Sequence, residues 1–322
     1  YLKGNNNMNV LEWDQIVIGT AAKPTNIAIT KEMILNYRES IEDTNSQNES
    51  ALLPAPAGMF FIYAPARRLD IMHENGFISP EETEQNSRST PFVGTDIEWK
   101  NNQIKENDII TSTAFFEKKW ESSSGNRFLS IGVKAKNQNN KPVINYNYNV
   151  MWEFSKGQKS RSEKTITKNS KTKILNNTQF DINNISEGDF TPTIQRNISQ
   201  ETINKYHELN NWSNKEPSPT SLLHIDEAFA EATVFSGITL SGPTAVSFML
   251  HLVEIIFGQK SIINSTFKER ALEPVRPGDT IIYSGEIIGI KNTILGKTVD
   301  LEVRGSNQFG QTTSLASVNI PC

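Results

Sequence analysis

One eleven-residue stretch occurs twice in the chain, first as Ile29-Thr30-Lys31-Glu32-Met33-Ile34-Leu35-Asn36-Tyr37-Arg38-Glu39 and again as Ile198-Ser199-Gln200-Glu201-Thr202-Ile203-Asn204-Lys205-Tyr206-His207-Glu208. The isoleucines, the hydroxyl residue, the tyrosine and two glutamates coincide at an offset of 169 residues. Further on, Lys105-Glu106-Asn107-Asp108-Ile109-Ile110 matches Arg276-Pro277-Gly278-Asp279-Thr280-Ile281, and Asn137-Gln138 matches Asn307-Gln308 at nearly the same offset. Three matches in one order at one spacing predict two copies of a single domain.

The length of the chain agrees with this prediction. Its 322 residues suit two domains of about 150 residues, each large enough for its own core. We place the first domain at residues 8–154 and the second at 189–322. Residues 155–188 between them are polar, rich in Lys, Ser, Asn and Thr, and are predicted to form a solvated linker.

Composition excludes several classes of protein. The net charge of −4 and the pI of about 5.7 give no reason to expect a nucleic-acid partner. The single cysteine, Cys322, cannot form an intrachain disulfide or a cysteine metal site. The longest apolar run, residues 245–257, is interrupted by His251 and Glu254 and is too short to span a bilayer. We therefore expect a cytoplasmic protein, and the absence of a dinucleotide or phosphate-loop motif predicts no cofactor.

Each copy has the same predicted order of elements. Residues 29–41 and 198–209 carry apolar side chains at helical spacing, with Thr30 and Ser199 at the capping positions. In the second copy, residues 245–257 are apolar on nearly every face, which predicts a buried helix that begins near Pro243 and ends at Gly258. In the first copy the corresponding helix should lie within residues 59–73, where Pro65 would begin or break it.

Strand patterns follow the buried helix in both copies. Alternating or β-rich segments cover residues 280–288, 298–304 and 313–320, and their counterparts cover 109–116, 127–136 and 142–154. A central helix wrapped by antiparallel strands, twice in one chain, predicts an α+β fold that resembles the double hotdog.

The local motifs of the second half resemble those of the MaoC-like dehydratases, the (R)-specific 2-enoyl-CoA hydratases. The resemblance rests on Tyr206-His207-Glu208-Leu209, on Leu223-His224-Ile225-Asp226-Glu227-Ala228-Phe229-Ala230, on Ser241-Gly242 before the buried helix, and on Val275-Arg276-Pro277-Gly278-Asp279-Thr280. It covers most of residues 198–320 and, more faintly, 29–154. It implies a lyase of fatty acid metabolism that adds water to a 2-enoyl thioester or removes it from a 3-hydroxyacyl thioester, carried by coenzyme A or by an acyl carrier protein. It leaves room for a homodimer of double hotdogs.

This chemistry requires an imidazole and a carboxylate around one water, and an N–H donor for the thioester oxygen. The resemblance gives His224 the imidazole position and the Gly242 amide the oxyanion position. The family's aspartate position, five residues before the histidine, is Pro219, and Ser241 stands where the family usually has histidine. An insertion at residues 213–219 carries one acid, Glu216, which we take as the candidate replacement.

The second copy lacks the aspartate of the pair, whereas the first copy lacks the histidine: it keeps Asp43 but has Asn48 where the histidine would fall. We therefore expect a degenerate first half, with Asp43 and His224 apart. Asp226 should fix a local turn. His207 should lie on a helix surface and His251 in the buried helix. The resemblance also points to substrate contacts at Ser241, Phe229, Ser221, Arg67 and Arg68, the two arginines being candidates for a phosphate of coenzyme A.

Three interpretations of His224 remain open at this point. It is a catalytic base helped by Glu216 or a water, a substrate-binding group in a related thioester reaction, or a structural histidine that satisfies a carbonyl. The corresponding functions are a hydratase, a thioesterase on the same fold, and a non-catalytic thioester-binding or scaffold protein.

Overall fold

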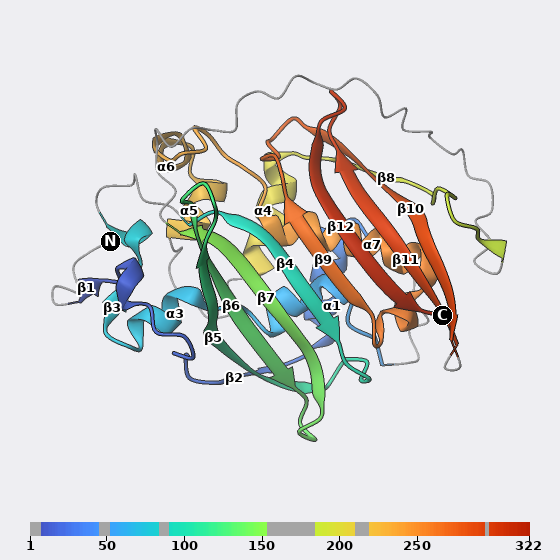
Figure 1. Ribbon diagram of the computed structural model, residues 1–322, viewed down its shortest axis with the longest axis horizontal. Helices are drawn as coiled ribbons and strands as arrows, with labels where there is room; N and C mark the ends of the chain where they lie inside the picture. Colours follow the sequence, from blue (N-terminus) through green and yellow to red (C-terminus); the bar gives the residue numbers. More distant parts are fainter. Residues whose placement is uncertain (1–7, 45–51, 84–89, 153–183, 210–218, 294–295) are drawn as a thin grey trace.

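A computed structural model describes residues 8–44, 52–83, 90–152, 184–209, 219–293 and 296–322. Ten strands form one sheet that curves around the helices (Figure 1). Their bounds are β2 Thr25–Ala28, β4 Phe92–Trp99, β5 Ile109–Glu121, β6 Arg127–Lys136, β7 Pro142–Trp152, β8 Ile194–Asn197, β9 Thr266–Ala271, β10 Thr280–Thr293, β11 Gly296–Ser306 and β12 Thr312–Pro321. A separate pair, β1 Asn9–Val10 and β3 Phe77–Ile78, is parallel.

The order of strands in the sheet contains the repeat. It runs β2-β5-β6-β7-β4 and then β9-β12-β11-β10-β8, so the second half has the order of the first in reverse. The halves join through the equivalent strands β4 and β9, which pair antiparallel with Ile97 opposite Phe267. Antiparallel pairing of two equivalent strands is what a two-fold axis produces between identical subunits. The chain thus has the double hotdog fold that the repeat predicted.

The matched polar motifs hold the same turn in each half. Asp108 accepts hydrogen bonds from the Lys105 backbone N–H (2.9 Å) and from Gln138 Nε2 (2.9 Å). Asp279 accepts the equivalent bonds from the Arg276 backbone N–H (2.8 Å) and from Gln308 Nε2 (3.1 Å). Both aspartates stand just before a long strand, as expected, and the asparagine–glutamine pairs recur because each glutamine braces this turn.

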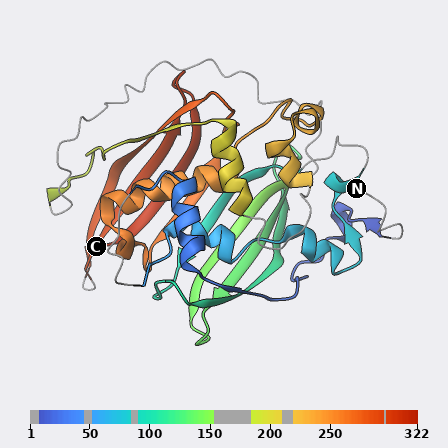
Figure 2. The same ribbon diagram turned by 180° about the vertical axis from the view of Figure 1, so that it is seen from behind.

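The helices lie on one face of the sheet (Figure 2). Two short helices begin at the predicted caps: α1 (Lys31–Ser40), where Thr30 accepts from the Met33 N–H, and α4 (Gln200–Glu208), where Ser199 accepts from the Thr202 N–H. The central helix of the second half is α7 (Gly242–Phe257). Its buried face, which includes Phe248 and Leu252, fills the core against the strands. The remaining helices are η1 Trp13–Gln15, η2 Ala57–Met59, α2 Phe60–Tyr63, α3 Arg68–His73, η3 Pro80–Glu82, α5 Pro219–Ile225, α6 Glu227–Ala232 and η6 Gln259–Ile262.

The central helix of the first half is shorter than that of the second. It consists of η2 and α2 and stops at Ala64, next to Pro65, before the chain resumes in α3. Proline lacks an N–H and disfavours the helical conformation in the residue before it, so it breaks the helix here. The expectation of a long central helix in both halves is therefore correct only for the second. Most of the predicted linker, residues 155–183, lies outside the described residues. No helix in the described ranges has the length and apolarity needed to cross a bilayer.

Candidate functional site

His224 is held by a backbone carbonyl at the edge of α7. Its Nδ1 lies 2.7 Å from the Thr239 carbonyl oxygen, and Thr239 itself is buried. A carbonyl can only accept, so Nδ1 carries the hydrogen and Nε2 carries a lone pair. Nε2 has no hydrogen-bond partner within the described part of the chain. The Thr239 carbonyl therefore selects a single tautomer, and no described residue bonds to its basic nitrogen.

Burial determines the protonation state of His224. Removal from water lowers its pKa to about 4, against a smaller opposing contribution from the Thr239 hydrogen bond. Part of this lowering comes from the neighbouring His207 and Arg68, because a positive charge on His224 would be repelled by theirs. The imidazole is consequently neutral at physiological pH.

The sequence suggested that His207 lies on a free helix surface, but the structure places it elsewhere. Its ring is half-buried and faces the His224 ring, with 6.4 Å between ring centroids. Burial lowers the pKa of His207 as well. The expectation was wrong because α5, which carries His224, packs against α4 and covers that side of the helix.

Gly242 is the first residue of α7, and its N–H has no partner among the residues that the structure describes. The N-terminus of a helix carries partial positive charge, so such an amide favours an anionic oxygen. A Cβ at Gly242 would lie 2.0 Å from the Phe92 ring, which belongs to the first half. Only glycine fits at this contact between the halves.

The carboxylate of the proposed pair lies outside what the structure describes, because Glu216 falls in residues 210–218. Within the described ranges no carboxylate makes a hydrogen bond or ion pair with His224. Asp226 instead caps α6 by accepting from the Phe229 N–H (2.9 Å), as predicted. Its role is local.

The other candidate contacts have structural partners of their own. Ser241 caps α7 by accepting from the Thr244 N–H (3.3 Å), and its hydroxyl lies 2.6 Å from the Thr244 hydroxyl. Ser221 and Phe229 are half-buried on α5 and α6. Their contacts with substrate stay predictions.

The two arginines are engaged within the first half. Arg67 pairs with Asp70 (2.7 Å) and Glu74 (3.4 Å). Arg68 pairs with Glu81 (2.6 Å) and donates to the Thr90 carbonyl (3.0 Å). A phosphate would have to compete with these carboxylates for the two arginines. The sequence pattern alone did not reveal these ion pairs.

The equivalent position in the first half is built differently. Ala55 donates to the Ile104 carbonyl (2.9 Å) just as Leu240 donates to the Val275 carbonyl (2.8 Å), so Ala57 corresponds to Gly242 and Pro54 to Thr239. The Pro54 carbonyl accepts from Arg38 (3.3 Å) and Gln259 (3.4 Å) instead of an imidazole. Among the described residues, no imidazole contacts the first-half carbonyl that corresponds to that of Thr239.

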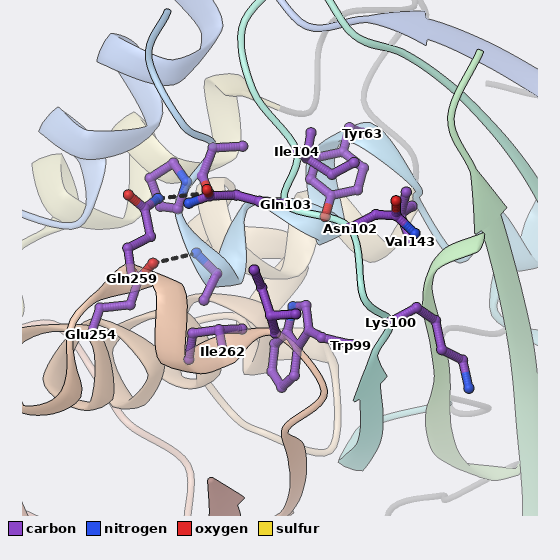
Figure 3. Close-up of a pocket in the computed structure, with 14 residues that line it drawn as sticks. Tyr63, Trp99, Lys100, Asn102, Gln103, Ile104, Val143, Glu254, Gln259 and Ile262 are labelled. Carbon is purple, nitrogen blue, oxygen red and sulfur yellow. Dashed lines mark hydrogen bonds between the residues drawn. The ribbon is translucent and has the colours of Figure 1, made fainter. Parts of the chain in front are cut away.

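The Ala57 amide is already occupied. It donates to Glu254 Oε1 (2.8 Å), a carboxyl that reaches it from the end of α7 (Figure 3). The pKa of Glu254 is raised to about 8, mainly by burial and in part by the Asp43 carboxylate, while the Ala57 hydrogen bond and Arg38 oppose the rise. The adjoining cavity of about 30 Å³, lined in part by Tyr63, Trp99 and Gln259, has room for one or two waters.

Asp43 faces a histidine other than His224. His251 Nε2 lies 3.5 Å from Asp43 Oδ1, and Arg196 donates to His251 Nδ1 (3.0 Å). His251 follows Gly242 by nine residues on α7, roughly 13 Å along the helix. Arg196 occupies Nδ1, so Nε2 is the nitrogen that faces Asp43, and this buried contact joins the two halves. Asp43 and His224 were expected to be apart, and this contact places Asp43 beside the second half of α7, away from Gly242.

Comparison with solved structures supports the fold. Nearly the whole chain superposes on a MaoC-like dehydratase (TM-score 0.67, 12% identity, 94% of this chain and 98% of that one). A MaoC-like dehydratase from Phytophthora capsici gives a TM-score of 0.61 at 12% identity, covering 97% and 99%. A conserved hypothetical protein of Mycobacterium tuberculosis described as a double hotdog gives 0.60 at 9% identity, covering 97% and 98%. No protein-family model and no curated protein sequence matches the chain.

The class of protein follows from these findings. The chain is a double hotdog protein with the fold of the MaoC-like dehydratases. At these identities the likeness concerns the fold, so the activity has to be argued from the site.

Proposed function

We propose that this protein is a hydratase or dehydratase of acyl thioesters, with its site at His224 and Gly242 in the second half. One observation carries the proposal. The Thr239 carbonyl fixes the His224 ring through Nδ1, and Nε2 has no partner in the described structure. Three residues after Thr239, the N–H of Gly242 at the start of α7 also has no partner there. The carbonyl that orients the proton acceptor and the N–H proposed as the oxyanion donor thus stand on one short segment. The imidazole and this N–H are two of the groups that addition of water to an enoyl thioester requires.

The reaction balances with these two groups. Nε2 takes a proton from water, the oxygen bonds to C3 of the enoyl chain, and the C2–C3 π electrons move toward the thioester carbonyl. The Gly242 N–H stabilises the resulting enolate oxygen. The imidazolium then returns its proton to C2 as the carbonyl re-forms. Removal of water from a 3-hydroxyacyl thioester is the reverse sequence.

The low pKa of His224 makes Glu216 important to the proposal. A base whose pKa is about 4 is always unprotonated at pH 7 but accepts a proton reluctantly. A carboxylate beside Nε2 would raise the pKa of the imidazole and supply a second acid–base group. Glu216 is the only acid in the insertion that precedes α5, so we assign it this role.

A second function has one specific observation in its favour. No carboxylate contacts His224 within the described residues, so the same site suits a protein that binds an acyl thioester without transforming it. In that case the imidazole and the Gly242 N–H would serve only as hydrogen-bonding groups for the ligand.

The test is turnover of a panel of short to long trans-2-enoyl-CoA thioesters and their acyl carrier protein counterparts. Loss of His224 in His224→Ala should lower hydration at least about 100-fold, the usual contribution of a general base. Glu216→Gln should cause a similar loss. His207→Ala is the matched control, since His207 lies beside the His224 ring without a bond to it, and it should stay within about threefold of the parent protein.

Three other results would redirect the assignment. Release of free coenzyme A instead of hydration would indicate a thioesterase. Full activity of Glu216→Gln would remove Glu216 from the mechanism. A folded protein that binds these thioesters but turns none of them over would favour the binding function.

A further inference from the structure

The segment between α6 and α7 carries the Thr239 carbonyl that holds His224 of α5, and it leads directly into Gly242, so its conformation decides whether the proposed site forms. The Thr239 carbonyl holds His224, and Gly242 follows three residues later. The segment lacks regular structure and includes two residues with positive φ, Ser236 (52°) and Gly237 (140°). Such a backbone persists only where neighbouring groups hold it.

One side chain holds the middle of this segment. Arg276 donates through Nη2 to the Phe235 carbonyl and through Nη1 to the Ile238 carbonyl (3.5 Å). Its neighbour Val275 accepts from the Leu240 N–H (2.8 Å), which anchors the end of the segment next to the helix. The guanidinium therefore fixes the backbone immediately before the carbonyl that orients His224.

Arg276 is itself held in place. Its backbone N–H donates to Asp279, which Gln308 braces from the other side. A Cβ at Gly237 would lie 3.1 Å from Arg276 Nη1, so backbone and guanidinium are in close contact. Arginine suits this place because its planar group can donate to two carbonyls at once.

The first half provides an internal comparison. Lys105 occupies the position of Arg276 and its backbone makes the same bond to Asp108. Its side chain is exposed, and its ammonium has no partner among the described residues. The turn is therefore common to both halves. Among the described residues, the contact of the side chain at this position with the segment before the central helix occurs only in the half that contains His224.

We propose that Arg276 is a positioning residue for His224 and Gly242: it holds residues 235–238 so that the Thr239 carbonyl keeps the imidazole in its Nδ1–H form. This inference rests on the proposed function for its effect on rate. The effect on the imidazole is independent of any activity. Arg276 contacts neither His224 nor the reacting atoms in our assignment.

The experiment compares Arg276→Met with Lys105→Met in the full chain. NMR of ¹⁵N-labelled histidine reports which nitrogen of His224 carries the proton, without substrate. We expect one Nδ1–H tautomer in the parent and in Lys105→Met, and a mixture in Arg276→Met. In the enoyl-CoA assay Arg276→Met should lower kcat about 10- to 100-fold, the scale of a misplaced catalytic group, with KM changed less than about threefold.

Two further variants apply if Arg276→Met does not fold. Arg276→Lys keeps the charge but cannot bridge both carbonyls, and Gly237→Ala displaces the backbone from the guanidinium. Both should give the same mixture of tautomers. An unchanged Nδ1–H tautomer in the folded variants would overturn the proposal. If the parent protein hydrates no thioester, the proposed function fails, while the tautomer measurement still decides the role of Arg276.

Discussion

The two central helices begin with the same backbone bond and then differ in what surrounds their first N–H. In the second half the Gly242 amide has no partner in the described structure, Gly242 lies against the Phe92 ring, and the Thr239 carbonyl three residues earlier holds a neutral His224. In the first half the Ala57 amide donates to Glu254. The Pro54 carbonyl, which corresponds to that of Thr239, accepts from Arg38 and Gln259. Within the described residues, a protein carboxyl fills the first position, whereas no protein group bonds to the N–H at the second.

The difference shows how a duplicated domain can specialise. Two identical subunits must keep two identical sites, because each substitution appears in both. Once the copies are fused, α7 can carry Glu254 into the first site while the first half supplies Phe92 to the second. Each half thus completes the surroundings of the other's helix start, and the chain retains one candidate site.

The largest expected effect comes from exchanging the residues at the two helix starts. Gly242→Ala places a methyl group against the Phe92 ring, which should lower the free energy of unfolding by about 1–3 kcal/mol and remove most hydration activity. Ala57→Gly should cost only about 0.5–1 kcal/mol and leave activity unchanged. Urea unfolding and kcat/KM of the two variants provide the measurement.

A double variant separates packing from chemistry in that comparison. Phe92→Ala removes the clashing ring, so Gly242→Ala with Phe92→Ala should regain stability relative to Gly242→Ala alone. Equal losses of activity in Ala57→Gly and Gly242→Ala would mean that the two helix starts are not functionally different.

Glu254 gives the second prediction, a pH dependence of stability. Its pKa is about 8 in the folded protein and 4.5 in its ordinary state, so the folded protein holds a proton that the unfolded chain releases between these values. The stability that this proton gives is complete below about pH 4.5 and is lost as pH rises through 8. Relative to Glu254→Gln, the parent should lose roughly 1–3 kcal/mol of unfolding free energy between pH 5 and 8.

The comparison with Glu254→Gln removes the contributions of other titratable groups to the pH dependence of the unfolding free energy. Burial also raises the pKa of Glu269 to about 8, but Glu269 is present in both proteins and cancels in the difference. Urea unfolding at several pH values measures the effect. A difference that does not change with pH would show that Glu254 remains ionised against Ala57, Asp43 and Arg38.

Local chemistry explains how much of the fold could be predicted. The caps at Thr30 and Ser199, the apolar run of α7 and the aspartates before β5 and β10 can each be recognised from residues close by in the sequence, and the structure confirms them. The pairing of β4 with β9 could not be predicted, because it joins residues far apart in the sequence. The broken first helix was indicated by one local residue, Pro65.

The candidate site was less predictable for a related reason. His224 and Gly242 were found through their motif, but the group that orients His224 is the backbone carbonyl of Thr239, and a carbonyl leaves no trace in a sequence. Glu254 did leave a trace, as a carboxyl in an otherwise apolar helix. Its partner, the Ala57 amide in the other half, required the tertiary structure.

The smallest expected effect concerns Ser241, which caps α7 and which the family resemblance also suggested as a substrate contact. If it is only a cap, Ser241→Ala should cost about 1 kcal/mol of unfolding free energy and change KM for an enoyl-CoA by less than about threefold. Ser199→Ala is the matched control, because Ser199 caps α4 through the same bond, to the Thr202 N–H (3.0 Å). A tenfold or larger rise in KM in Ser241→Ala alone would assign its hydroxyl to the substrate and would extend the difference between the two helix starts from their first N–H to the residue before it.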